Sequence, residues 1–380
     1  MNMKKSIFLF TSLIGVLALT GCNKNKQTSS STSTNDDNRP YEQGDPKTLK
    51  GTGTIFNEVL GYNTKDASIF QDGNERYVVY ASNEEEKGPQ VFAARKATLV
   101  DSKWVYEKKH IILKADANSW DKNIYNPSVI KGEFAYQGTT YSYLMAYNGN
   151  DNKNGTNNHI GLAVSNNFLE GWKKVGSKPI LTNPEVFEAS YGFGSPSLLS
   201  YDNKGKGYMF YAVGETEVSF TAVKSYDFSN LDSLILAPGY ASLPITGLTD
   251  KVEGNAIIMN AGFALSKDKA SLYMVRDRLP QSANKPNQTT EVEIDKADVS
   301  IISDLSKGWT VTDNITGMKT MDIEDEESLG WDQIYSGEFV TDPYGVLLDL
   351  AKSEVIYSTY DEDANDPSYS STLASYEVTL

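Results

Sequence analysis

The stretch Tyr125–Gly149, "YNPSVIKGEFAYQGTTYSYLMAYNG", decides the fold. It contains two runs of β-branched and aromatic residues separated by a turn, which is typical of two antiparallel strands. The first run opens on Asn126-Pro-Ser, and the second is rich in tyrosine. The same pair of runs recurs along the chain, so this stretch represents one unit of a repeat.

Similar openings follow one another at intervals of 60 to 76 residues. They are Asp66-Ala-Ser-Ile, Asn126-Pro-Ser-Val, Ser195-Pro-Ser-Leu, Asn260-Ala-Gly-Phe and Ser336-Gly-Glu-Phe. A tyrosine-rich strand follows each opening, and a third strand is clearest at 159–175 and 220–236. A period of this size indicates repeated four-stranded blades. We therefore expect an all-β, five-bladed β-propeller over residues 51–380, in which the N-terminal strand at 51–61 completes the last blade and closes the ring.

The first 21 residues have the pattern of a secretory signal peptide. Lys4 and Lys5 precede an uncharged run, and its apolar core of about 14 residues is too short for a permanent membrane helix, which needs about 20. The run ends in Leu19-Thr20-Gly21-Cys22, which resembles a bacterial lipoprotein signal in which the cysteine carries the lipid. Cys22 is the only cysteine, so it is the expected anchor; the alternative is an ordinary signal peptide with a chance cysteine.

Residues 22–50 are polar and rich in Ser, Thr, Asn and Asp, so we expect a disordered tether after the lipidated cysteine. The net charge of −15 disfavours nucleic acid and offers no basic cluster for anionic lipids. The expectation is a secreted monomer that faces outward and is held at the bacterial membrane through Cys22 alone.

The segment Asn158–Leu181, "NHIGLAVSNNFLEGWKKVGSKPIL", resembles the third and fourth strands of a blade in the five-bladed propeller glycoside hydrolases, which include arabinanases, xylosidases and invertase-like enzymes. The resemblance extends over about residues 51–380. It implies a carbohydrate in a central funnel, where one acid protonates the leaving oxygen and a second carboxylate activates water or attacks. A second hypothesis from another class is a non-catalytic surface propeller that binds a glycan or a protein.

Carboxylates near the openings are the candidates for catalysis under this resemblance. Asp66 matches the place of the base in the first blade, whereas the second blade has Asn126, which can bond a sugar hydroxyl but cannot take a proton at neutral pH. Asp121 lies just upstream and could substitute if its loop folds inward. The identity of the general acid is not decided by these patterns, and Glu188 and Glu253 are its first candidates. Strand alternation places Glu338 on the face of Ser336, where it could assist.

The remaining candidates would bind substrate. Aromatic side chains beside the openings could stack on sugar faces or pack between blades: Tyr125, Tyr191, Phe193, Trp331 and Tyr335. Polar side chains at the openings could bond sugar hydroxyls: Asn126, Ser195 and Asn260.

No cofactor or metal is expected. His110 and His159 have no metal-binding spacing, and His159 is more simply explained as structural. The segment 150–161 resembles the start of a calcium loop but lacks its first aspartate and last glutamate.

Overall fold

The computed structural model describes residues 53–56, 64–84, 89–152, 155–183, 191–214, 219–237, 240–242, 260–278, 289, 291–316, 333–360 and 371–380. The predictions for Cys22, Glu188, Glu253 and Trp331 fall outside these residues. Within them the chain is built from strands and three short 3-10 helices, η2 (Leu231–Ser233), η3 (Val299–Ser303) and η4 (Leu350–Lys352).

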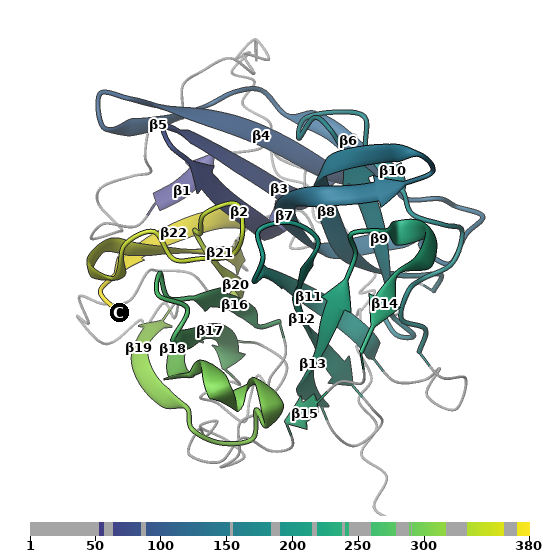
Figure 1. Ribbon diagram of the computed structural model, residues 1–380. Coiled ribbons are helices and arrows are strands. Elements are labelled where there is room, and N and C mark those ends of the chain that lie inside the picture. Colours follow the sequence, from purple (N-terminus) through teal and green to yellow (C-terminus); the bar gives the residue numbers. More distant parts are fainter. Residues whose placement is uncertain are drawn as a thin grey trace, which may run out of the picture. The chain divides into compact units, whose positions relative to one another are not determined.

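The strands form five antiparallel sheets, which are the blades of a propeller (Figure 1). The predicted five-bladed, all-β architecture is confirmed. In blades 1 and 3 the fourth strand position is divided between two short strands. Blade 1 contains β2 (Lys65–Asp72), β3 (Glu75–Asn83), β4 (Gln90–Val100), β5 (Lys103–Tyr106) and β6 (His110–Lys114); blade 2 contains β7 (Asn123–Tyr136), β8 (Thr139–Asn150), β9 (His159–Ser165) and β10 (Lys173–Lys174).

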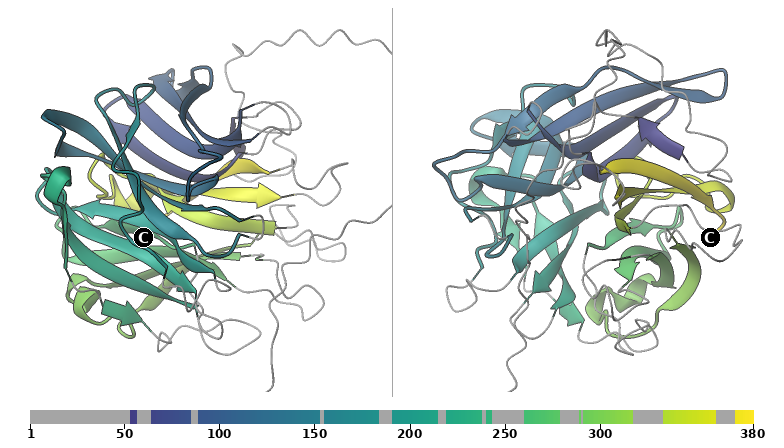
Figure 2. Two further views of the ribbon diagram at one scale, coloured as in Figure 1. Left: turned by 90° about the vertical axis from the view of Figure 1, so that its right-hand side faces the viewer. Right: turned by 180° about the vertical axis from the view of Figure 1, so that it is seen from behind.

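Blade 3 contains β11 (Gly192–Ser200), β12 (Lys206–Gly214), β13 (Ser219–Asp227), β14 (Ile235–Leu236) and β15 (Tyr240–Ser242); blade 4 contains β16 (Gly262–Leu265), β17 (Ser271–Arg278), β18 (Glu291–Asp298) and β19 (Thr310–Thr316); blade 5 contains β20 (Gln333–Phe339), β21 (Ser353–Tyr360), β22 (Thr372–Val378) and β1 (Gly53–Phe56). The N-terminal strand β1 pairs with β22 and so supplies the outer strand of the last blade, as predicted (Figures 1 and 2). This pairing closes the ring between the two ends of the folded chain.

Apolar side chains fill the space between neighbouring blades, because strand alternation gives each sheet two apolar faces. At the interface of blades 3 and 4, for example, the rings of Phe210 and Phe263 stack with centroids 4.0 Å apart. Comparable buried clusters lie at the other four interfaces. The core of the molecule is therefore a set of five interfaces around a central channel.

One end of that channel is closed by the segment 341–346 of blade 5. Four of its carbonyl groups each accept one backbone N–H from the innermost strand of another blade: Gln71 donates to Thr341, Lys131 to Pro343, Ser200 to Tyr344 and Leu265 to Gly345, at 2.8 to 3.0 Å. The carboxylate of Asp342 fixes the turn by accepting from the N–H groups of Tyr344 and Val346. The channel is therefore blind at this end.

Candidate functional site

The first residue of each opening has the same unusual backbone conformation. Asp66, Asn126, Ser195, Asn260 and Ser336 have φ angles of 53°, 46°, 46°, 49° and 53°. Non-glycine residues seldom adopt this left-handed region, although Asn and Asp tolerate it best. In four of the blades the strand pairing shifts at the same place, as in a β-bulge. The five residues line one central cavity of about 20 Å³, which has room for about one water molecule.

Polar groups of several blades join into one chain of hydrogen bonds around this cavity. The hydroxyl of Ser195 donates to Oδ1 of Asn260 (2.6 Å), and Nδ2 of Asn260 donates to Oδ2 of Asp277 (2.8 Å). The backbone N–H of Ser336 donates to Oδ1 of Asp277 at 2.6 Å. From blade 2, Nδ2 of Asn126 reaches the hydroxyl of Ser336 at 3.4 Å. Asn126 therefore serves as a donor that helps to hold the fifth opening.

Asp66 is buried at the first opening, and its backbone N–H donates to the hydroxyl of Ser358 at 2.9 Å. Burial raises the pKa of its carboxyl group. The charge of Lys65 and hydrogen bonds from the side chain of Ser336 and the backbone of Asn126 act in the opposite direction. Asp66 is thus a carboxyl group with an increased tendency to hold a proton, as acid–base chemistry near neutral pH requires.

A second carboxyl group, Asp277, lies beside the fourth and fifth openings on β17. It is 4% exposed, and burial raises its pKa to about 8 although hydrogen bonds from Asn260 and Ser336 lower it. The negative charge of Asp66 contributes to the rise. Ser336 connects the two carboxyl groups, because its N–H donates to Asp277 and its side chain bonds Asp66. The sequence patterns did not single out Asp277, since it belongs to the second strand of its blade and not to an opening.

Glu338 lies two residues into the fifth opening and also lines the cavity. Its carboxylate occupies the space beside Gly262, where a Cβ atom would lie 2.5 Å from Oε2. The residue is half-buried, and removal of the carboxylate from water raises its pKa to about 8. Strand alternation predicted that Glu338 could reach the funnel, and the structure brings it together with Asp66 and Asp277 around one channel.

Glu338 and Gly262 interrupt a ring of serines in this channel. The equivalent residues of the first three blades are serines, and the hydroxyl of each accepts a backbone N–H from the next blade at 3.0 Å: Ser68 from Val129, Ser128 from Leu198 and Ser197 from Phe263. In blades 4 and 5 a glycine and a glutamate replace two serines. The missing side chain in blade 4 makes the room that the carboxylate of blade 5 fills.

Two of the candidate aromatic residues stand next to the carboxyl groups. Burial, followed by the charge of Asp66, raises the pKa of Tyr125 to about 12, and Nζ of Lys65 lies 5.4 Å from the centre of its ring. Burial also raises the pKa of Tyr191 to about 12, and its hydroxyl lies 3.4 Å from that of Ser195. Both tyrosines are therefore neutral groups at the margin of the channel.

The other candidates have different surroundings. The ring of Phe193 packs edge-on against Tyr211 at 5.7 Å, and Tyr335 is half-buried directly before Ser336. Asp121 is fully buried, accepts from the hydroxyl of Tyr147 at 2.9 Å and pairs with Lys174 at 2.5 Å. It is not among the residues that line the central cavity.

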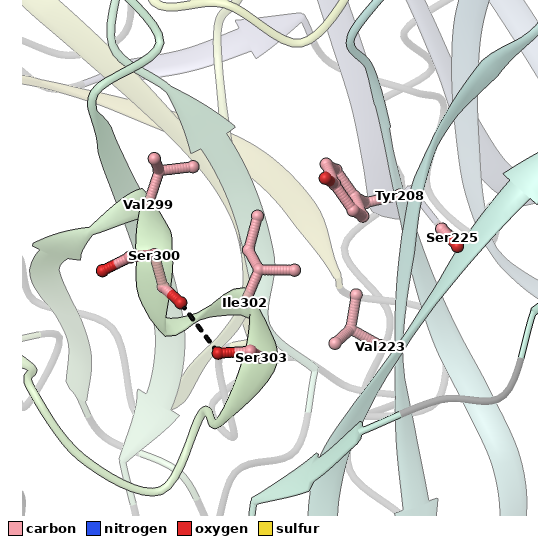
Figure 3. A pocket seen from close by; sticks show the side chains of 7 residues that line it. All are labelled: Tyr208, Val223, Ser225, Val299, Ser300, Ile302 and Ser303. Carbon is pink, nitrogen blue, oxygen red and sulfur yellow. Dashed lines mark hydrogen bonds between the residues drawn. The ribbon is translucent and has the colours of Figure 1, made fainter.

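A larger cavity of about 430 Å³ lies away from this site, between blades 3 and 4 (Figure 3). Ile302 and Val299 face Tyr208 and Val223 across it. Serine and tyrosine side chains share its wall with these apolar groups, and the hydroxyl of Ser303 is already bonded to the carbonyl of Ser300. The described residues that line it include no carboxyl group, whereas Asp66 and Glu338 line the central channel.

Among the residues that the structure describes, no group of three or more His, Cys, Asp or Glu side chains is arranged to hold a metal ion. Nδ1 of His159 accepts the backbone N–H of Asn183 at 2.9 Å, and burial lowers the pKa of this histidine. No helix in the described part of the chain is long and apolar enough to cross a membrane.

No family model and no curated protein sequence matches this chain. Solved structures do resemble it. A thermostable family-43 glycoside hydrolase is 14% identical, with a TM-score of 0.52, over 84% of this chain and 90% of that chain. The structure of a BT0996–RGII complex is 13% identical, with a TM-score of 0.54, over 88% of this chain and 92% of the matched one.

A third similar structure is Zg3597, a family 117 glycoside hydrolase produced by the marine bacterium Zobellia galactanivorans. It is 10% identical, with a TM-score of 0.51, over 84% of this chain and 85% of that chain. At such identities the likeness concerns the fold, and it agrees with the sheet order and ring closure described above. The chain has the five-bladed β-propeller fold found in these glycoside hydrolases.

Proposed function

We propose that this protein binds a neutral carbohydrate at the open end of its central channel and hydrolyses a glycosidic bond there. The single observation that carries the proposal is the meeting of Asp66 with a second carboxyl group, Asp277, through Ser336 at the centre of the ring. Glycoside hydrolysis uses carboxyl groups that are held close together. The similar fold of known glycoside hydrolases supports the same class of reaction.

In this proposal Asp66 is the base or nucleophile. The acid is one of three glutamates: Glu188, Glu253 or Glu338. Glu338 is supported by its raised pKa of about 8, because a carboxyl group that is protonated at neutral pH can give a proton to a leaving oxygen. Asn126 and the tyrosines beside the openings would bond and stack on the sugar. No Lys, Arg or His is among the described residues that line the central cavity, which favours a neutral sugar over an acidic one.

The location of the protein is part of the proposal. Cys22 would carry a lipid, and residues 23–50 would act as a tether that holds the propeller on the outer side of the bacterial membrane. An enzyme held in this way would act on carbohydrate outside the cell as a monomer without a cofactor.

The test compares the full chain, purified in detergent, with its Asp66→Asn variant. Release of reducing ends from arabinan and arabinoxylan is measured, together with binding of their oligosaccharides by calorimetry. We expect the variant to lose at least about 100-fold in turnover, because loss of a proton-transferring group has effects of this order, while the affinity changes little. Unchanged turnover would exclude Asp66 as the base.

Separate Glu→Gln variants of the three glutamates then assign the acid. Turnover of substrates with a good leaving group, such as 4-nitrophenyl glycosides, should survive loss of the acid far better than turnover of polysaccharide, since a good leaving group needs less protonation. A glutamate whose replacement affects both substrates equally is not the acid.

One observation favours non-catalytic glycan binding as the second candidate. Four of the five opening residues are uncharged amides or hydroxyls, and they are bonded mainly to one another. Such groups suit the recognition of sugar hydroxyls. Oligosaccharide binding without hydrolysis, and with similar affinity in the Asp66→Asn variant, would support this candidate.

A further inference from the structure

We propose that the cavity between blades 3 and 4 is a binding site for a neutral disaccharide, separate from the central channel. The side chain of Tyr208 forms one wall of this cavity, and the 3-10 helix η3 forms the opposite wall (Figure 3). The inference does not depend on the proposed hydrolysis, because no residue of the channel takes part in it.

The cavity lies at the end of blade 3 that is remote from the openings. Tyr208 pairs with Leu199 on β11, four residues beyond Ser195 of the third opening, which is about 13 Å along a strand. The next residue, Ser200, donates its N–H to the segment 341–346 that closes the channel. Tyr208 is therefore level with the closed end, and a ligand beside it lies away from the ring of openings.

Aromatic contacts fill the equivalent place at two other blade interfaces. Tyr77 and Tyr273 are the counterparts of Tyr208, since each of the three pairs with the residue four places into its opening. The ring of Tyr77 meets that of Phe168 of blade 2 edge-on at 5.2 Å. Tyr273 is fully buried, and its ring lies 6.5 Å from that of Phe339 of blade 5. Tyr208 differs from both because its ring faces a cavity.

A change of residue in the repeat accounts for the open space. Phe168 of blade 2 and Leu305 of blade 4 are equivalent, because the carbonyl group of each accepts the indole N–H of a tryptophan four residues later. Blade 2 thus turns a phenyl ring toward Tyr77, whereas blade 4 has the smaller leucine at this position. A ligand could supply the ring that Tyr208 does not receive from blade 4.

The groups around the cavity match the two kinds of surface on a sugar. The ring of Tyr208 and the side chains of Val223 and Ile302 offer apolar contacts to C–H groups. The hydroxyls of Tyr208 and Ser225 bond to no other group in the part of the chain that the structure describes, so both can donate to a ligand and accept from it. Across the cavity, the hydroxyl of Ser303 donates to a backbone carbonyl group and can still accept a bond.

The charge and size of the cavity define the class of ligand. No Lys, Arg, His, Asp or Glu is among the described residues that line it, so a charged ligand would lose hydration without gaining an ionic partner there. Its volume of about 430 Å³ lies within the range of about 300 to 1,000 Å³ for small-molecule sites, which suits a disaccharide. The ring of Tyr201, which is 43% exposed, lies 5.5 Å from that of Tyr208 and extends the aromatic surface outward.

The test uses the full-length protein in detergent and four neutral probes: cellobiose, xylobiose, maltose and lactose. Digalacturonic acid is the charged probe. Ligand-observed NMR measures the affinities, and we expect at least one neutral disaccharide to bind in the millimolar range and digalacturonic acid to bind more weakly. Amide hydrogen exchange then locates the bound sugar, which should slow exchange in peptides that cover η3.

Two variants assign the site, and a third is the matched control. Tyr208→Leu removes the aromatic wall, and Ser303→Trp places a large side chain in the cavity from an exposed position. Each should weaken binding at least about tenfold. Tyr77→Leu makes the same change as the first variant at the equivalent position of blade 1, and it should leave binding unchanged.

Unchanged binding in either cavity variant would overturn the proposal, as would unchanged exchange in η3 with a disaccharide bound. Failure of all four neutral probes to bind, or tighter binding of digalacturonic acid, would also overturn it. If Tyr208→Leu does not fold, the exposed position of Ser303 lets the second variant decide. Slower exchange in η3 that Ser303→Trp abolishes would support the site even in a chain whose channel neither binds nor hydrolyses a sugar.

Discussion

Replacement of Glu338 by glutamine should stabilise the protein at alkaline pH. The side chain lies in the channel beside Gly262, and burial raises its pKa from the ordinary 4.5 to about 8. An acid whose pKa is higher in the folded state favours folding less and less as pH rises between these two values. Glutamine has the same shape and no charge, so it removes this loss.

The size of the effect follows from the difference between the two pKa values. At roughly 1.4 kcal/mol for each pH unit, a change from 4.5 to about 8 corresponds to at most about 5 kcal/mol. Water can still reach part of the side chain through the channel, which reduces the effect to about 2 to 3 kcal/mol. For a domain of about 330 residues this is a rise in melting temperature of about 3 to 4 °C.

Calorimetry or urea unfolding at a series of pH values would measure it. The Glu338→Gln variant and the unaltered protein should have equal stability below about pH 4.5, and the variant should be more stable above about pH 8. Glu133→Gln, which removes an exposed carboxylate, is the matched control. A gain that is the same at all pH values, or a loss of stability at alkaline pH, would refute the reasoning.

Three further variants test the closure of the ring and of the channel. Arg76 on blade 1 is 7% exposed, lies 4.2 Å from the centre of the Trp104 ring and forms a two-point ion pair with Glu354 of blade 5. Arg76→Met should therefore cost about 2 to 3 kcal/mol in unfolding free energy, and Glu354→Gln should cost less; equal stability in urea would contradict this. Asp342→Ala should cost about 2 to 3 kcal/mol, because two N–H groups of the closing segment lose their acceptor, and a change in melting temperature below about 1 °C would contradict this role.

The repeat of openings predicted the fold because each opening is a local signal. A short polar residue followed by Pro, Ala or Gly, and in three of the five openings by Ser, as in Asn126-Pro-Ser, permits a left-handed residue and a bulge at the start of a strand. The five left-handed residues confirm that the openings are equivalent positions. The prediction did not depend on the outer strands, whose sequence patterns are less clear. Strand β10, for example, has only two residues, and blade 2 is still a four-stranded sheet.

The centre of the site was harder to predict because its contacts join distant parts of the chain. Asp277 accepts the N–H of Ser336, which lies 59 residues later in the sequence. In the sequence itself, Asp277 in "MVRDR" is one of many acidic residues. Alignment of the second strands by blade would have matched it with Ser358 and exposed the difference in charge. The closing segment 341–346 gives no sequence signal of its role, because its partners lie on four different blades.

The geometry of the channel limits which groups a ligand can contact. One end is closed by the segment 341–346, and the cavity at the centre has room for about one water molecule, so a sugar can approach only the ring of openings. Glu338 lies two residues deeper than that ring, and Asp277 is hydrogen-bonded behind it. Asp66 is therefore the one described carboxyl group at the level of the openings. For a sugar that stays at this level, Glu188 and Glu253 are the remaining candidates for the acid in the sequence. Loss of activity on replacing Glu338 alone would mean instead that the sugar reaches below the ring of openings.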